Sequence, residues 1–410
     1  MSSFPANVAG VTLGIASVFR HADYRRLWLS GFCVNVARWM DLVTLGWLAL
    51  ELTGSPFMVA LAAFVRSAPL MLFGPFGGIV ADRLPRGRIL VTTQAIGVAT
   101  ALLLAALFAT GAGGYTPLVL LEVVFGSLWA LDFPARRTAL YTLLGAQRVA
   151  QAVSLETVSM QLAKMLGPLA AGLCLARGGA TVCFVLMAVV YAAGLGVSLD
   201  LRGRLGRATG AARVSVVASL RAGLYAAWTR RTLRAVLLAT IAMNTLFFTY
   251  QHMLPVFARD VLQVGPAALG ALLAADGAGA LIGALAIASR HGHLAHRPLF
   301  AAAIVTGPVL LVAMSALSSL PACLALMVLL GVAESGFAAM QSTIVLLSAP
   351  EGARGGTMGI LSACIGTQPL GTLAIGVLTA SIGVSLTFTL NALVALAAIV
   401  PLAVMLVRRP

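Results

Sequence analysis

Charged residues are scarce in this chain: Asp, Glu, Lys and Arg together occupy 10% of its 410 positions. A soluble globular protein of this length carries roughly a quarter charged residues, so the composition excludes that class of protein. Hydrophobic residues make up 60% of the sequence instead. The composition therefore predicts an integral membrane protein.

Cysteine is scarce as well, and its count of five is odd, which does not suit a disulfide framework. The five residues are Cys33, Cys174, Cys183, Cys323 and Cys364. All of them lie in or beside apolar segments, where cysteine acts as a small packing residue. We therefore expect neither a disulfide framework nor a cysteine metal site.

Motifs of enzyme chemistry are missing too. The chain has no G-x-x-x-x-G-K-[ST] pattern, so direct use of ATP is not indicated. Its five histidines fall in predicted loops or at helix ends, without a convincing catalytic partner. Three of them, His291, His293 and His296, form HGHLAH, where a solvated loop is favoured over a weak metal site. We expect no enzymatic activity, no cofactor and no bound metal.

Acidic residues are few: 12 Asp and Glu stand against 27 Lys and Arg, for a formal net charge of +15. In a soluble protein this excess would suggest a nucleic-acid partner. Here only Arg177 and Arg259 fall in predicted outer turns, and Arg38, Arg66 and Lys164 fall within predicted spans. Every other basic residue lies at one set of helix ends, which the positive-inside rule assigns to the cytoplasm. We expect no nucleic-acid binding.

Long apolar runs dominate what is present. Each is about 20 residues or longer, the length that a helix needs to cross a bilayer. They lie near 28–50, 57–81, 89–110, 117–137, 149–176, 180–200, 233–257, 266–289, 298–318, 321–347, 357–380 and 384–407. We predict an all-α protein of about twelve spans with both termini cytoplasmic, preceded by a polar interfacial lead-in at residues 20–27.

The N-terminal segment and the composition also indicate the cellular location of the protein. Residues 1–19 lack a basic n-region and a convincing cleavage site, so we expect no removable signal peptide. Arginine far outnumbers the single lysine, and Ala and Gly are abundant, which suggests a GC-rich bacterial genome. The expected location is a bacterial inner membrane.

The longest polar interval, residues 201–232, divides the chain. We predict a six-helix bundle at 1–200, a cytoplasmic linker at 201–232 and a second six-helix bundle at 233–410. Within the linker, residues 214–228 have apolar positions at helical spacing and could lie flat on the inner membrane surface. The halves also look related, because GPLAAG at 167–172 corresponds to QPLGTLAIG at 368–376. Two equivalent units are what a two-fold transporter requires.

The stretch 74–88, GPFGGIVADRLPRGR, passes from an apolar helix into a basic turn. Its spacing G-x-x-x-D-R-x-x-R-x-R resembles the loop signature between helices 2 and 3 of the major facilitator superfamily. The residues that carry this resemblance are Gly78, Asp82, Arg83, Arg86 and Arg88. The alternative, an ordinary positive-inside loop, explains the arginines but not the spacing of glycine and aspartate.

Four further stretches narrow the resemblance to one branch of the superfamily. LAKMLGPLAAG at 162–172 is similar to the helix-5 signature that marks export by antiport in this superfamily, through Gly167, Pro168 and Gly172. A packing kink is the alternative interpretation. Residues 38–56, 250–284 and 352–376 resemble the branch that contains enterobactin exporters and macrolide efflux pumps. The corresponding second-half motif at 283–297 lacks its acidic residue.

The resemblance implies a conformational latch. In the superfamily the motif aspartate holds the outward-open state closed on the cytoplasmic side, a role that falls by position on Asp82. We expect its partners to be Arg136 or Arg137 and the N-terminus of the helix near Thr357, whose dipole favours an anion.

Charges inside predicted spans are costly and are therefore default functional candidates. The candidates for substrate binding and proton coupling are Arg38, Asp41, Arg66, Glu122, Glu156, Lys164, Asp276 and Glu334. Arg38 and Asp41 share one helix face, so they either pair structurally or meet the substrate. Lys164 lies before the Gly–Pro kink on a stripe with Glu156, and either pairs with a carboxylate or meets an anionic ligand.

Together these features predict a secondary transporter that exports a bulky amphipathic small molecule, such as a siderophore or drug, in exchange for protons. We expect a monomer in contact with membrane lipid. The basic residues within the predicted spans favour an anionic cargo, unless carboxylates neutralise them. The alternatives are a transporter of lysophospholipids or other lipid-like substrates with the same fold, and a membrane scaffold or sensor that does not transport.

Overall fold

The computed structural model describes residues 19–205, 216–289, 295–350 and 353–408. Within these ranges, the side chains of residues 73–83, 141–142, 145–151 and 216–220 lie outside the description. Every regular element of the described residues is helical, which confirms the all-α prediction.

The helices follow one another closely along the chain. They are α2 (Ala22–Thr53), α3 (Pro56–Arg83), α4 (Arg86–Ala109), α5 (Tyr115–Leu199), α6 (Val216–Thr229), α7 (Arg231–Ala242), the π-helical segment η1 (Met243–Phe247), α8 (Tyr250–Asp260), α9 (Pro266–Ser289), α10 (His296–Ser315), α11 (Leu320–Ser348), α12 (Arg354–Ile365), α13 (Gln368–Ile382) and α14 (Val384–Val407).

The long helix α5 is three antiparallel segments rather than one rod. Arg137 and Glu156 form an ion pair at 3.2 Å, although a straight helix would separate them by about 28 Å. Likewise the Cys183 thiol contacts the Ala171 carbonyl at 4.0 Å, where a straight helix would leave about 18 Å. Gly179, at φ 66°, lies between those two residues. The chain therefore reverses between Arg137 and Glu156 and again at Gly179.

Twelve helical segments of the described chain have the length to cross a membrane. Nine stretches are both long and apolar enough, and one of them, Ala152–Leu199, contains 48 residues. The reversal at Gly179 divides that stretch into two. Helices α2 and α3, of 32 and 28 residues, also exceed the roughly 20 residues that a span requires. The predicted number of spans is therefore confirmed.

Some helix boundaries differ from the prediction. The lead-in at 20–27 is largely part of α2, because Tyr24 and Leu27 are buried and hold the first turns against the protein. Span 7 contains the π-helical segment η1, and span 11 breaks at Gly366–Thr367. Pro369 lies in the first turn of the new helix α13, where its missing N–H costs nothing.

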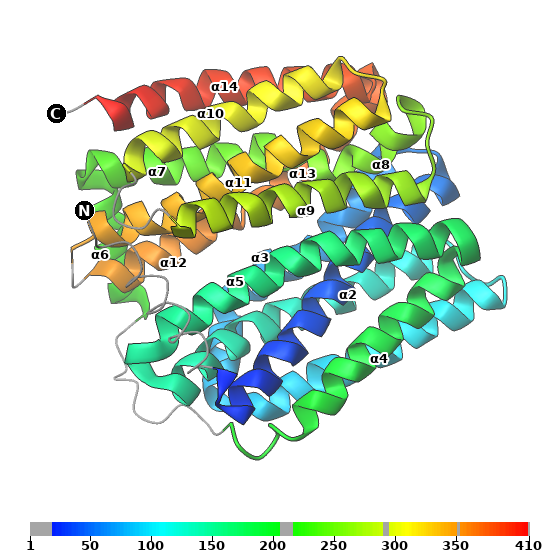
Figure 1. Cartoon of the computed structure of the whole chain (residues 1–410), viewed down its shortest axis with the longest axis horizontal. Coiled ribbons are helices and arrows are strands. Elements are labelled where there is room, and N and C mark those ends of the chain that lie inside the picture. The colour runs from blue at the N-terminus through cyan, green and yellow to red at the C-terminus, as the bar shows by residue number, and fades with distance from the viewer. Residues whose placement is uncertain (1–18, 206–215, 290–294, 351–352, 409–410) are drawn as a thin grey trace, which may run out of the picture.

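The helices alternate between two ends of the molecule. The end that carries most of the arginines, here called the basic end, contains the starts of α2, α4, α7, α10 and α12. The opposite end contains the far ends of α2, α4, α8, α10 and α13 and the short turns. Helices α2–α5 and α7–α14 form two groups, which converge toward the opposite end and separate toward the basic end (Figure 1). Helix α6 packs on α12, with Gly223 against Gly356 and Thr357.

Polarity is distributed as a membrane protein requires. Apolar side chains such as Leu120, Leu285 and Leu386 are more than half exposed on the outer surface. Charged side chains such as Glu122 and Asp276 are completely buried between helices. In lipid, apolar groups on the outside cost nothing, whereas a charge needs a partner inside the protein. The search for a functional site therefore starts from the buried charges.

Candidate functional site

Three candidate residues meet within the first group of helices, and we call them the arginine triad. Arg66 on α3 lies with its Nε 2.5 Å from Oδ2 of Asp41 on α2 and 3.5 Å from Oε2 of Glu122 on α5. The Arg66 side chain is 12% exposed, and both carboxylates are almost fully buried. One guanidinium thus faces two carboxylates, so the triad carries one surplus negative charge when all three groups are ionised.

Arg38 has a different environment from the one its spacing suggested. Asp41 pairs with Arg66 and not with Arg38, because the helix crossing brings α3 against the Asp41 face of α2. The Arg38 guanidinium lies 4.0 Å from the centre of the Trp129 ring and 6.0 Å from that of Trp39. Among the described residues, no carboxylate oxygen lies within 4.0 Å of Arg38. Aromatic faces therefore stabilise this cation.

A second cluster, the lysine triad, joins the two groups of helices. Lys164 on α5 places its Nζ 2.8 Å from Oδ2 of Asp276 on α9 and 2.5 Å from Oε2 of Glu334 on α11. Gln251 on α8 donates to the same two carboxylates, at 3.4 Å each. Asp276 is buried, whereas the Glu334 side chain is 21% exposed. Here too one cation faces two carboxylates.

A close helix contact adjoins each triad, and the two contacts are alike. A Cβ added to Gly126, on the first segment of α5, would collide with the carbonyl oxygen of Arg66 on α3. A Cβ added to Gly331, on α11, would collide with the carbonyl oxygen of Asp276 on α9. In each half, therefore, a glycine lets two helices touch at the residue that anchors the charge cluster.

Small residues also fix the lysine triad at the contact between α5 and α9. A Cβ on Gly277 would lie 2.7 Å from the Met165 nitrogen and 2.8 Å from the Lys164 carbonyl carbon. Further along, a Cβ on Gly270 would lie 3.1 Å from the Cα of Gly172. Only glycine permits backbones this close. Of the predicted helix-5 signature, Gly172 lies in this contact, while a Cβ on Gly167 would meet the α2 backbone at Met40.

Contacts at the opposite end close the two groups of helices against each other. Arg259 on α8 donates to the Leu50 carbonyl of α2 at 3.3 Å. A Cβ on Gly46 would lie 2.8 Å from the Pro255 ring. These contacts and those of α5 with α9 lie between the level of Lys164 and the opposite end, where the ribbons converge (Figure 1).

His252 is a central residue that sequence reasoning missed. The prediction that the histidines are loop or helix-end residues is wrong here, because His252 lies within α8 and is 9% exposed. It lines a cavity of about 10 Å³ together with Gln251, Gly46 and Pro255. Its Nε2 has no hydrogen-bond partner among the described residues. The sequence signal that could have identified His252 is its position directly after Gln251 within an apolar stretch.

Charges nearer the basic end form a separate network. Arg136 makes two 3.0 Å hydrogen bonds to Asp132 and a 2.8 Å bond to the Leu27 carbonyl. Arg137 pairs with Glu156 at 3.2 Å. Glu156 thus belongs to this network and lies apart from Lys164, although both fall on one stripe of α5. One helical stripe spans several levels of the membrane, so the shared face did not imply a shared site.

The predicted latch is only partly described. The side chains of Gly78, Asp82 and Arg83 lie outside the described residues. The partners expected for Asp82, Arg136 and Arg137, form ion pairs with Asp132 and Glu156. Of the remaining motif residues, Arg86 is buried and Arg88 is exposed.

Comparison of the sequence with known protein families identifies the family of this chain. The family model described as a transmembrane secretion effector, within the major facilitator superfamily, matches residues 14–409. The chain belongs to this family. It is therefore a multi-pass membrane transporter and not an enzyme, and the non-transporting scaffold is set aside.

Two relatives of this chain are named for the transport of small molecules. The multidrug efflux pump Tap of Mycolicibacterium fortuitum is 27% identical over 362 residues, covering 85% of this chain and 87% of the pump. The staphyloferrin A transporter of Staphylococcus aureus is 26% identical over 163 residues, covering 40% of this chain and 41% of the transporter.

Solved structures show the same fold. A bacterial homologue of the human lysosomal transporter Spinster, in an inward-facing and unoccupied conformation, superposes with a TM-score of 0.71 at 13% identity, covering 94% of this chain and 96% of that one. A mutant form of the peptide transporter POT gives 0.74 at 13% identity, with 93% of each chain covered. At these identities the likeness establishes the major facilitator fold alone.

Proposed function

We propose that this protein is a proton-coupled exporter of a bulky amphipathic small molecule, such as a siderophore or an antibiotic. It works as a monomer in a bacterial inner membrane, with the basic end and both termini in the cytoplasm. The observation that carries the proposal is the lysine triad, because it joins the two groups of helices in the membrane interior.

The charge balance of the triad supports proton coupling. Asp276 and Glu334 together carry one negative charge more than Lys164 neutralises. An unneutralised charge in the membrane interior is costly, so a proton or a cationic group of the cargo is favoured there. The partly exposed Glu334 is the more accessible of the two carboxylates.

The triad also supports coupling to alternating access. Moving the halves apart at α5 and α9 separates Lys164 from its two carboxylates. A proton on either carboxylate weakens that attraction and so lowers the cost of the movement. Proton binding would then select between the state closed at the opposite end and the state open there, as the rocking of two repeats around a central site requires.

The arginine triad and the latch complete the proposal. Asp41 and Glu122 form a second proton-accepting pair around Arg66. Asp82 holds the basic end closed in the state that is open at the opposite end. Gly78, Arg83 and the nearby arginines belong to the same motif. The division into bundles at 1–200 and 233–410, with the linker 201–232 between them, fits this rocking movement.

The cargo is proposed from the relatives and from Arg38. The relatives that match this chain are named for multidrug efflux and for staphyloferrin A, so an amphipathic drug or siderophore is the class to test. Arg66 and Lys164 are each flanked by two carboxylates, which removes them as a reason to expect an anion. Any preference for an anionic cargo therefore rests on Arg38 beside Trp129.

The deciding experiment measures substrate-dependent proton movement in proteoliposomes with a pH-sensitive probe inside. The panel contains siderophores, macrolides, dyes and lysophospholipids. We expect a signal for a siderophore or a drug that Glu334→Gln abolishes. Glu51→Gln is the matched control, because Glu51 is an exposed carboxylate near the C-terminus of α2. A proton signal that survives Glu334→Gln, Asp276→Asn and Asp41→Asn would refute the coupling, and a signal for lysophospholipids alone would favour the lipid-like cargo.

A further inference from the structure

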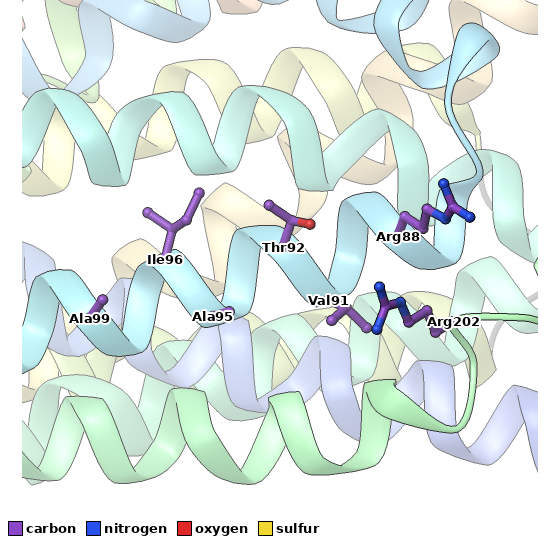
Figure 2. A pocket seen from close by; sticks show the side chains of 7 residues that line it. All are labelled: Arg88, Val91, Thr92, Ala95, Ile96, Ala99 and Arg202. Atoms are coloured by element: carbon purple, nitrogen blue, oxygen red, sulfur yellow. The ribbon is translucent and has the colours of Figure 1, made fainter.

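The outer face of α4 carries a hollow near the basic end. Its volume is about 410 Å³. Arg88 and Arg202 lie at its head, and its floor is mostly apolar, formed by Val91, Thr92, Ala95, Ile96 and Ala99. Figure 2 shows the floor residues in a row along α4 and both arginines at the same end of that row. The opposite face of α4, including Leu90, Gln94 and Gly97, is buried in the protein, so the hollow faces the membrane.

Backbone packing brings the two arginines together. Arg88 lies in the first turn of α4, and Arg202 lies in the turn that follows α5. Gly87 allows these segments to touch, because a Cβ there would lie 3.0 Å from the Cα of Arg202 and still closer to the Leu201 carbonyl oxygen. The Gly87 N–H donates to the Leu205 carbonyl at 3.4 Å. The arginine pair is therefore built into the fold.

The two guanidinium groups lack anionic partners within the described part of the protein. No carboxylate oxygen there lies within 4.0 Å of Arg88 or Arg202. Two acidic side chains described near this turn pair with other arginines: Asp200 with Arg26 at 3.1 Å, and Asp23 with Arg26 and Arg204. The N-terminus of α4 adds the positive end of its dipole beside Arg88. Two like charges and a helix N-terminus in one place favour an anion.

We propose that this hollow binds an anionic phospholipid of the surrounding leaflet. The phosphate lies between Arg88 and Arg202, and one acyl chain lies along the floor. The floor continues for about 16 Å of helix from Arg88 to Ala99, at 1.5 Å per residue. A free phosphate would use the arginines but leave the apolar floor without an occupant. The charged head and the apolar floor together fit a lipid.

The position of the hollow at a helix end places the arginines at headgroup depth. Anionic lipids attract basic residues at a membrane surface, and each nearby arginine contributes roughly fivefold to binding. The bound lipid clamps the start of α4 to the 200–205 turn. It therefore gives Arg88 a binding role that is separate from the predicted latch and independent of the proposed cargo and of proton coupling.

The test is retention of lipid by the purified full-length protein, measured by native mass spectrometry after exchange with phosphatidylglycerol or with phosphatidylcholine of the same acyl chains. We expect the protein to retain more phosphatidylglycerol. Arg202→Gln should lower that retention roughly fivefold, and Arg202→Lys should restore most of it. Ala95→Phe fills the floor without changing charge, and it should lower the retention of phosphatidylglycerol as well.

Arg408→Gln is the matched control, because Arg408 is exposed at the same end and does not line the hollow. It should leave retention unchanged. The proposal is overturned if the protein retains both lipids equally, or if Arg408→Gln lowers retention as much as Arg202→Gln, since general surface charge would then account for binding. Unchanged retention in Ala95→Phe would also overturn it, because the acyl chain would then lie elsewhere. Thermal melting of each variant separates loss of the site from loss of the fold.

Discussion

Lys164 Nζ lies 2.8 Å from Asp276 Oδ2, and this ion pair joins the second segment of α5 to α9 across the junction of the two helix groups. The backbones carrying both residues touch at Gly277. A movement of one group against the other at this level must therefore change both a charge interaction and a helix contact. The predictions below test these and other contacts separately.

The first prediction concerns the ion pairs of Lys164. Lys164→Ala leaves Asp276 and Glu334 in the membrane interior without their cation. Removing one partner of a buried pair costs about 3–5 kcal/mol, so we expect a large loss of thermal stability together with loss of transport. Melting temperature in detergent and uptake in proteoliposomes measure the two effects.

Neutralising a carboxylate in the same background should reverse part of the stability loss. Lys164→Ala combined with Asp276→Asn is expected to melt above Lys164→Ala alone, because the remaining carboxylate no longer faces a second charge. Equal melting of the single and double variants would show that Lys164 stabilises the fold by packing and not by its charge.

The second prediction concerns the contact of α5 with α9. Gly277→Val adds bulk where even a Cβ would lie 2.7 Å from the Met165 nitrogen. The two helices must separate, so we expect at least a tenfold loss of transport. Gly196→Val is the control, because a Cβ on Gly196 meets no atom within 4 Å. The measurement is transport by the two variants, compared at equal protein density in the membrane. Wild-type activity in Gly277→Val would exclude a tight contact at Gly277.

The third prediction compares two adjacent arginines. Arg136 is buried and makes two hydrogen bonds to Asp132, whereas the Arg137 side chain is 37% exposed. Arg136→Ala should therefore lower the free energy of unfolding by about 3–5 kcal/mol. Arg137→Ala should lower it by less, because the Arg137 side of its ion pair is open to water. Chemical unfolding in mixed micelles compares them, and equal effects would contradict the described geometry.

The fourth prediction concerns His252. This side chain lines the narrow cavity between the helix groups, and its Nε2 has no partner among the described residues. If that nitrogen bonds to cargo or water during transport, His252→Ala should reduce transport about tenfold while the melting temperature stays near that of the wild type. His296→Ala, at an exposed helix start, is the control. Unaltered transport in His252→Ala would remove the residue from the transport path.

Much of the fold followed from sequence because the bilayer imposes strong local rules. Span length, polar turns and the sorting of arginines predicted the crossing helices, which the structure confirms. The exceptions have local causes: Tyr24 and Leu27 extend α2 by packing, and Pro369 begins a new helix within span 11.

The sequence did not predict which charged side chains pair with each other. Spacing along α2 placed Arg38 beside Asp41, but the structure pairs Asp41 with Arg66 from the next helix and leaves Arg38 against Trp129. Spacing along α5 placed Glu156 on one face with Lys164, but Glu156 pairs with Arg137 instead. Helix periodicity defines a face, whereas the partner on that face depends on which other helix crosses it and at what depth.

The sequence by itself determined that the chain is an all-α membrane protein, how many times it crosses and which ends carry the positive charge. These properties depend on apolar length and charge position, which act residue by residue. Only the tertiary structure decided that one cation faces two carboxylates both within the first helix group and across the junction of the groups. It also decided that His252 lies between the groups and that Arg88 meets Arg202 on the outer surface. Those contacts join residues from helices far apart in the chain, and no local rule encodes them.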